Sequence, residues 1–275
     1  MKKTNRNVIF DAWVMFKRCF IISLRNPETL LTATLIPFCL ILLFGTVFGS
    51  ISNVGEYHYI DFIVPGIILQ SIAQASQYSA MNVASDMTRG MIDRFRCMSI
   101  SKSAGVIGHT GAGVIRGIIS NAVIVITAPI LGFRPQAGFV DWLLIISLLV
   151  LINITFTLIA VLCGTISKSA EGASGLLFPL FILPFISSGF APVDTMPSGI
   201  GWFAAIQPMT PMIDSLRALT LDLPLGNSLW LALSWCVGLS VVSFAVSIRT
   251  KASLICLLNT SYSSCRFDGS RKETS

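Results

Sequence analysis

The feature that most constrains this chain is a series of long stretches without Asp, Glu, Lys or Arg. They cover residues 29–55, 62–85, 117–133, 142–167, 172–193, 195–213 and 223–248. A helix needs about 20 predominantly apolar residues to cross the hydrocarbon core of a bilayer, and the stretches lack the alternating pattern of a membrane β-barrel. The sequence therefore predicts an all-α integral membrane protein.

Composition excludes an ordinary soluble domain. Of the 275 residues, 53% are hydrophobic and 12% are charged, whereas about a quarter of the residues of a soluble domain are charged. The stretch 195–213 is the exception among the apolar stretches, because Pro197, Pro208 and Pro211 divide it into short pieces. We interpret it as short re-entrant helices at the outer surface.

The distribution of Lys and Arg favours six transmembrane helices with both termini in the cytoplasm. In this arrangement only Arg134 and Arg217 face outward, as the positive-inside rule requires. We expect the side chain of Arg116, inside the third span, to reach back to the inner interface. The net charge of +6 is then an orientation signal, so nucleic acid is not an expected partner.

The expected boundaries follow from these stretches. Residues 1–250 form one transmembrane domain, and residues 251–275 form a cytoplasmic tail without regular structure. The chain is expected to lie in the plasma membrane. The spans are placed at about 29–50, 60–84, 106–132, 142–166, 173–190 and 225–248.

The loop between the second and third spans combines charges with apolar residues. In "SDMTRGMIDRFRCMSI" (residues 85–100), methionines, Ile92 and Phe95 recur at helical spacing among the charged residues. An orientation signal requires only positive charge. The mixture instead favours a short amphipathic helix that docks onto a partner protein.

Three motifs in this order resemble the permease subunits of type-2 ATP-binding-cassette exporters, in particular the daunorubicin/doxorubicin-resistance branch. They are "YIDFIVPGIILQ", "ASDMTRGMIDRFRCMSISKS" and "SSGFAPVDTMPSGIGWFAAIQPMTPMIDSLRAL", and "LRNPETLLTATLIPFCLILLFGTVFG" fits the family's first span. The resemblance implies an N-terminal amphipathic interface helix, a cytoplasmic coupling helix between spans two and three, and two short outer helices before span six. The chain departs from the family at Ser99, where proline is usual, and in its long tail.

The resemblance also implies that transport and ATP hydrolysis are carried out by different subunits. The permease would work as a dimer, with a second copy or a paralogue, and would bind a separate ATPase that carries ATP and Mg²⁺. No G-x-x-x-x-G-K-[ST] phosphate loop occurs here, so we expect no enzyme activity and no cofactor in this chain.

The Gly-rich stretch "GHTGAG" (residues 108–113) is interpreted as a helix-packing face. The expected contacts to the ATPase come from Asp93, Arg94, Phe95, Arg96 and Met98.

Polar residues suggest two further sites. Gln70, Gln74 and Gln77 share one helical face near Asn82, and they are either hydrogen-bonding groups between helices or the lining of a translocation path. Asp194 and Asp214 are expected near helix starts, with Arg217 at the outer headgroups, in a lid over the exit of the path.

We therefore expect a permease that exports an amphipathic drug, lipid or glycan-type cargo by alternating access. The alternative is a secondary transporter or channel driven by an ion gradient. Such proteins usually place ionisable groups at membrane depth, whereas every acidic residue here lies outside the apolar stretches.

Overall fold

The computed structural model describes residues 8–25, 27–48, 53–54, 57–88 and 102–269, and all structural statements refer to these. The regular secondary structure of this part of the chain is helical apart from one antiparallel hairpin of two-residue strands. In chain order the elements are α1 (Val8–Arg25), α2 (Pro27–Leu43), η1 (Phe44–Phe48), β1 (Asn53–Val54), β2 (Tyr57–His58), α3 (Tyr59–Thr88), α5 (Lys102–Thr127), η2 (Ala128–Leu131), α6 (Phe139–Ile166), α7 (Ala170–Leu176), α8 (Phe178–Ile182), η3 (Leu183–Ile186), η4 (Val193–Thr195), α9 (Ser198–Ile206), α10 (Met209–Thr220) and α11 (Ser228–Gly269).

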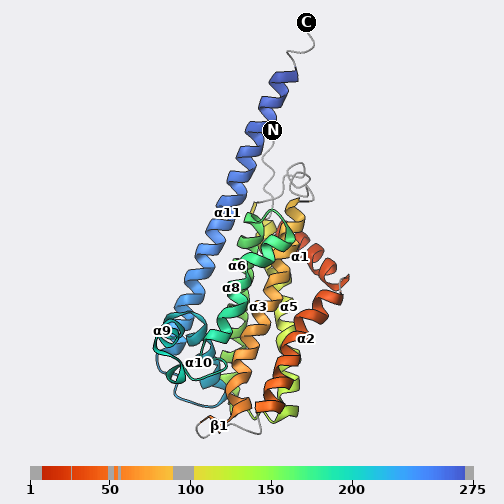
Figure 1. Cartoon of the computed structure of the whole chain (residues 1–275). Coiled ribbons are helices and arrows are strands. Elements are labelled where there is room, and N and C mark those ends of the chain that lie inside the picture. The colour runs from red at the N-terminus through yellow and green to blue at the C-terminus, as the bar shows by residue number, and fades with distance from the viewer. Residues whose placement is uncertain (1–7, 26, 49–52, 55–56, 89–101, 270–275) are drawn as a thin grey trace.

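Helix α3 lies at the centre of the bundle (Figure 1). It packs against α2, α5, α6, α7 and α10, and every residue from Ile60 to Ser76 is buried. The outside of the bundle is also apolar, since Phe139 on α6 is 81% exposed and Trp230 on α11 is 72% exposed. Apolar side chains both inside and outside are the pattern of helices surrounded by lipid. The predicted all-α fold is confirmed.

Three helices of the described chain are long and apolar enough to cross a membrane: Ala104–Leu131, Phe139–Ile166 and Ser228–Thr250. A shorter apolar helix covers Thr34–Val47. The six-span topology therefore stays a prediction. In place of one helix at 173–190 the chain forms α7, α8 and η3, because Pro179 and Pro184 remove backbone donors within this segment.

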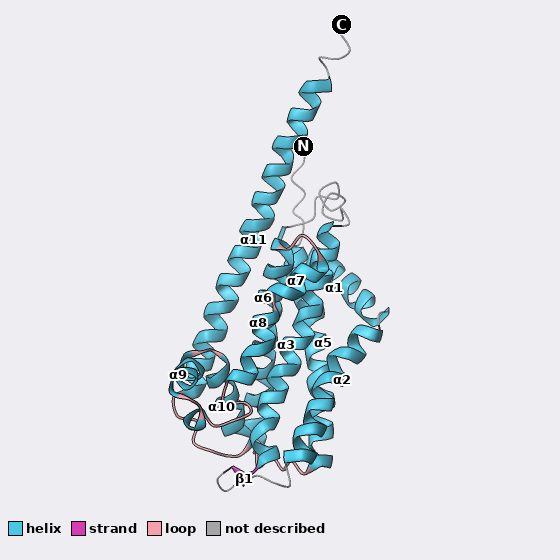
Figure 2. Ribbon diagram, viewed as in Figure 1, coloured by secondary structure: helices cyan, strands magenta, loops and turns pink. Residues whose placement is uncertain are grey.

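The two ends of the chain show one agreement and one difference. A helix, α1, precedes α2 as predicted, and its position at the membrane interface stays a prediction. The last helix does not stop near residue 248, because α11 continues to Gly269 and rises past the rest of the bundle in Figure 2. It takes in most of the tail for which no regular structure was expected. No proline or glycine occurs between Gly238 and Gly269, so nothing in the sequence breaks the helix.

The segment before α11 forms two short helices, α9 and α10, as predicted from its prolines. It lies beside the lower end of α3 in Figure 1. The start of α3 also lies very close to residue 189, since a Cβ added to Gly66 would lie 2.7 Å from the carbonyl oxygen of Gly189. Only glycine permits two backbones to come this close.

The glycines at the start of α5 form a packing face, as predicted. A Cβ at Gly108 would lie 2.7 Å from Met15, and one at Gly111 would lie 2.8 Å from the ring of Phe16. Both contacts join α5 to α1. Because the glycines have no side chains, α1 can pack directly against this face of α5.

Candidate functional site

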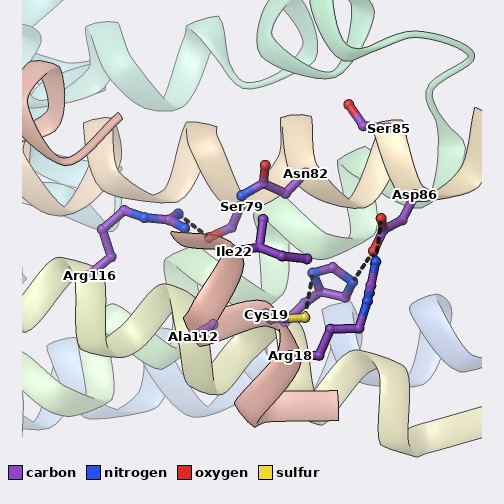
Figure 3. A pocket seen from close by; sticks show the side chains of 10 residues that line it. Arg18, Cys19, Ile22, Ser79, Asn82, Ser85, Asp86, Ala112 and Arg116 are labelled. Atoms are coloured by element: carbon purple, nitrogen blue, oxygen red, sulfur yellow. Dashed lines mark hydrogen bonds and ion pairs between the residues drawn. The ribbon is translucent and has the colours of Figure 1, made fainter. Parts of the chain in front are cut away.

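A polar pocket of about 370 Å³ lies between α1, α3 and α5 (Figure 3). It occupies the end of α3 that precedes residues 89–101 and the end of α5 that follows them. Its lining is mostly polar and consists of Arg18, Cys19, Ile22, Ser79, Asn82, Ser85, Asp86, His109, Ala112 and Arg116.

Asp86 joins the three helices at one side of this pocket. Its two carboxylate oxygens accept hydrogen bonds of 3.0 and 3.1 Å from the guanidinium of Arg18 on α1. His109 Nε2 of α5 lies 3.3 Å from the same carboxylate. Such bidentate, charge-assisted contacts are the strong hydrogen bonds of proteins. We call Arg18, Asp86 and His109 the ionic clamp.

The contacts of the ionic clamp change the acidity of Asp86, which lies beyond the predicted span 60–84. Burial alone raises the pKa of this carboxyl, but hydrogen bonds from His109 and Arg18 outweigh burial and hold the pKa well below its usual range. The hydrogen bond to Asp86 raises the pKa of Arg18. The carboxylate is thus ionised at neutral pH and holds its two partners.

Arg116 lies at the other side of the pocket and corrects an expectation. Its side chain does not reach to the interface: the residue is 2% exposed. Its Nε and Nη2 donate to Ser23 Oγ at 3.2 and 2.8 Å, and Nη1 donates to Ser79 Oγ at 3.3 Å and to the carbonyl of Ala75 at 3.5 Å. Ser23 of α1, which packs over α5, accepts from the guanidinium and holds it between the helices.

The predicted ATPase contacts, Asp93, Arg94, Phe95, Arg96 and Met98, all lie outside the described residues and stay a prediction. The structure does place the ionic clamp on both sides of them, since Asp86 is near the end of α3 and His109 is near the start of α5. The clamp itself was not predicted. The one signal of the clamp in the sequence is the carboxylate of Asp86 at the end of a predicted span. The partners of Asp86, Arg18 and His109, are distant in sequence.

The four predicted path residues do not form one uniform lining. Gln70 is fully buried, and neither its Oε1 nor its Nε2 has a hydrogen-bond partner in the described chain. Gln74 is 8% exposed, and Gln77 and Asn82 are partly buried. Of the four, only Asn82 lines the pocket. The translocation path stays a prediction.

The predicted outer lid contains a second ionic cluster and requires two corrections. Asp214 is not at a helix start, because α10 begins at Met209; it accepts hydrogen bonds from Ser188 Oγ at 2.7 Å and from Arg217 Nη1 at 2.8 Å. The side chain of Arg217 is 12% exposed, so it does not reach outward to headgroups. It also donates to the carbonyls of Phe62 and Ser188.

Arg217 faces inward because the start of α3 lies beside α10, where its guanidinium covers the ring of Phe62 at 3.8 Å. Asp194 lies apart from this cluster, exposed in the short helix η4. In the described part of the chain, no three His, Cys, Asp or Glu side chains come together in a group that could hold a metal ion.

These features are consistent with an integral membrane protein whose helix α1 is joined to its bundle by partly buried ionic contacts. The model of the ABC-2 type transporter family matches residues 11–221, and the chain belongs to that family. Members of the family are membrane permease subunits, which normally work with an ABC ATPase. The resemblance found in the motifs is confirmed.

Curated relatives carry related names. The daunorubicin resistance ABC transporter permease DrrB1 of Streptomyces coeruleorubidus is 28% identical over 193 residues, 70% of this chain and 67% of the relative. The probable doxorubicin resistance permease DrrC of Mycobacterium tuberculosis is 24% identical over 219 residues, 79% of each chain. The inner membrane transport permease YadH of Escherichia coli K12 is 27% identical over 218 residues, 74% of this chain and 82% of the relative.

Proposed function

We propose that this chain is the membrane-spanning half of an ATP-driven exporter. Two permease chains and two ATPases would form the transporter in the plasma membrane, with both termini of this chain in the cytoplasm. ATP and Mg²⁺ would bind to the ATPases. Two of the relatives above are named for resistance to daunorubicin or doxorubicin, which supports an amphipathic drug as cargo; a lipid- or glycan-type molecule is the other cargo class we propose.

The observation that carries this proposal is the position of the ionic clamp. Residues 89–101 connect α3 to α5, and the clamp joins these two helices to α1 one turn before that connection, at Asp86, and about two turns after it, at His109. A force applied to residues 89–101 by an ATPase would therefore move α1, α3 and α5 together. Rigid-body movement of packed helices is an established route from a binding event to a distant opening.

The opposite end of α3 is held to the predicted lid in a similar way. Arg217 and the close contact between Gly66 and Gly189 attach α10 and residues 188–189 to the start of α3. Movement of α3 at its clamped end would thus reach the lid. In this mechanism one helix connects the ATPase contact to the exit of the path, as alternating access requires.

An ion-gradient-driven transporter is the competing function. The named relatives are permeases of ABC type, which favours the ATP-driven function. The two functions predict different energy sources, so one transport assay separates them.

The test is reconstitution of the permease with its ABC ATPase in liposomes, with doxorubicin as the first cargo and a phospholipid dye as the second. We expect cargo movement to require ATP and to continue when an ionophore removes all ion gradients. Movement that persists without the ATPase and stops with the ionophore would establish the competing function.

A further inference from the structure

The buried guanidinium of Arg116 has only neutral partners in the described chain. They are the hydroxyls of Ser23 and Ser79 and the carbonyl of Ala75. The two other arginines with buried or half-buried ionic contacts each have a carboxylate: Arg18 contacts Asp86 and Arg217 contacts Asp214. Burial of an unpaired charge is costly. The site of Arg116 is therefore electrostatically incomplete.

The donors of Arg116 are also only partly used. A guanidinium has five N–H groups. Ser23 accepts from Nε and from Nη2, while the bonds of Nη1, 3.3 Å to Ser79 and 3.5 Å to Ala75, are at the long limit of hydrogen bonding. One N–H of Nη2 thus remains for a further acceptor, the two Nη1 bonds are long, and Arg116 lines a pocket of about 370 Å³ that can contain an acceptor.

The charge of the pocket is positive. Two guanidinium groups, Arg18 and Arg116, line it against one carboxylate, Asp86. That carboxylate is already engaged by Arg18 and His109. The uncompensated charge is at Arg116, and the missing ligand is therefore an anion.

The depth of the pocket indicates the kind of anion. The part of α3 between Tyr59 and Ser79 is about 30 Å long at about 1.5 Å per residue, which equals the thickness of a bilayer's hydrocarbon core. If Tyr59 lies at one boundary of the core, Ser79 and Arg116 lie close to the other boundary and Asp86 lies beyond it. The pocket would then extend from the edge of the core toward the headgroup region, where lipid phosphates lie.

We propose that the pocket binds an anionic phosphate headgroup, with Arg116 as its main contact. The headgroup belongs to a membrane lipid or to a phosphorylated cargo, and the chemistry of binding is the same for both. Planar guanidinium groups bind phosphate oxygens through paired hydrogen bonds. The site goes beyond the proposed function and does not depend on ATP as the energy source.

The test measures thermal unfolding of the full chain in a zwitterionic detergent, because a ligand of the folded state raises the midpoint with its concentration. The probes are inorganic phosphate, dioctanoyl phosphatidic acid and, as the uncharged control, dioctanoylglycerol. Arg116→Gln removes the charge but keeps donors for Ser23. Arg25→Gln makes the same charge change at the exposed end of α1, outside the pocket lining. Ala112→Leu adds volume to the pocket wall without any charge change.

We expect phosphatidic acid to stabilise the wild type and Arg25→Gln, and dioctanoylglycerol to have no effect. Loss of a charge-assisted contact weakens binding by about tenfold or more in Arg116→Gln, and Ala112→Leu weakens binding by the same order because the pocket is filled. If Arg116→Gln does not fold, the anion response of Ala112→Leu is compared with that of the Arg25→Gln control, and this comparison tests the proposal.

Inorganic phosphate separates the two sources. A lipid headgroup site responds to phosphatidic acid far more strongly than to phosphate, whereas a site that recognises only the phosphate of a cargo responds to both anions to a similar extent. The proposal is overturned if neither anion stabilises the wild type. It is equally overturned if all variants respond alike, because the anions would then bind elsewhere on the surface.

Discussion

Asp86 and His109 flank residues 89–101, and His109 Nε2 lies 3.3 Å from the carboxylate of Asp86. The contact closes the base of the predicted coupling loop, because it joins the end of α3 to the start of α5. Arg18 adds α1 to the same carboxylate. The helices that meet the loop are thus connected independently of the loop itself.

The first prediction concerns the acid sensitivity of the ionic clamp. The pKa of Asp86 is lower in the folded than in the unfolded chain, so its contribution to stability is complete above the unfolded pKa, about 4, and is lost as the pH falls through the folded pKa. Asp86→Asn should lower the free energy of unfolding at pH 7 by about 1 to 3 kcal/mol. The difference from wild type should shrink below about pH 4.

Thermal unfolding in detergent between pH 7 and pH 3 measures this difference. Asp194→Asn, which changes an exposed carboxylate in η4, serves as the control and should parallel the wild type. A constant difference between Asp86→Asn and wild type over the whole range would show that Asp86 is not stabilised in its ionised form.

The second prediction concerns the predicted coupling residues. Phe95→Ala combined with Arg94→Ala should weaken the complex with the ATPase by about 30- to 1000-fold, because aromatic and arginine anchors dominate binding at interfaces. Arg94→Lys with Arg96→Lys keeps the positive charge and should preserve membrane orientation. Co-purification with the ATPase and cargo-stimulated ATP hydrolysis measure both. If the double alanine variant still binds the ATPase and shows normal cargo-stimulated ATP hydrolysis, the loop acts only as an orientation signal.

The third prediction concerns topology. With single cysteines introduced into a cysteine-free chain, an impermeant maleimide should label position 198 in intact cells and should leave position 94 unlabelled. Position 94 should react once the membrane is permeabilised. Labelling of position 94 from outside would contradict the six-span arrangement with cytoplasmic termini.

The fourth prediction concerns the attachment of the lid. Arg217→Lys keeps the charge but loses the planar fork that contacts Asp214 and two backbone carbonyls. We expect the free energy of unfolding to fall by about 1 to 3 kcal/mol, because buried acceptors lose their donors. Arg134→Lys, at an exposed arginine, should have almost no effect. Equal effects of the two substitutions would mean that Arg217 acts through charge alone.

The fifth prediction concerns the contact between α3 and residue 189. A methyl group at Gly66 would lie 2.7 Å from backbone atoms of Gly189, so Gly66→Ala should destabilise the protein by about 1 to 3 kcal/mol through overpacking. Gly238→Ala is the matched control. It lies in α11 with open space around it, and alanine there should raise stability by about 0.5 to 1 kcal/mol. Unfolding midpoints that rise for both variants would contradict the close contact.

Much of the fold could be predicted from the sequence, because local patterns determine it. Apolar stretches gave the long helices, and Pro197, Pro208 and Pro211 indicated two short helices rather than a span. The surroundings of Arg116 and Arg217 could not be predicted. Their burial depends on α1 and on the start of α3, which are distant in sequence, and no periodic pattern records which distant helix covers a side chain.

The ionic clamp was missed for the same reason. Arg18 and Asp86 are 68 residues apart, and no local pattern in the sequence connects them. The sequence motif instead predicted a site in the loop between α3 and α5, because the apolar and charged residues of this loop form a continuous local pattern.

Helices α3, α5 and α6 meet at glycines of α5. A side chain at Gly113 would collide with Ser79 of α3 and Thr157 of α6, and one at Gly117 would collide with Asn153 of α6. The polar side chains of the neighbours occupy these notches, so α5 cannot slide along α6 without first separating from it. If these three helices move as one unit, a passage would open at the borders of the unit, with α1, α2, α7, α10, α11 or another subunit. The notches thereby limit where a hinge of the transporter can lie.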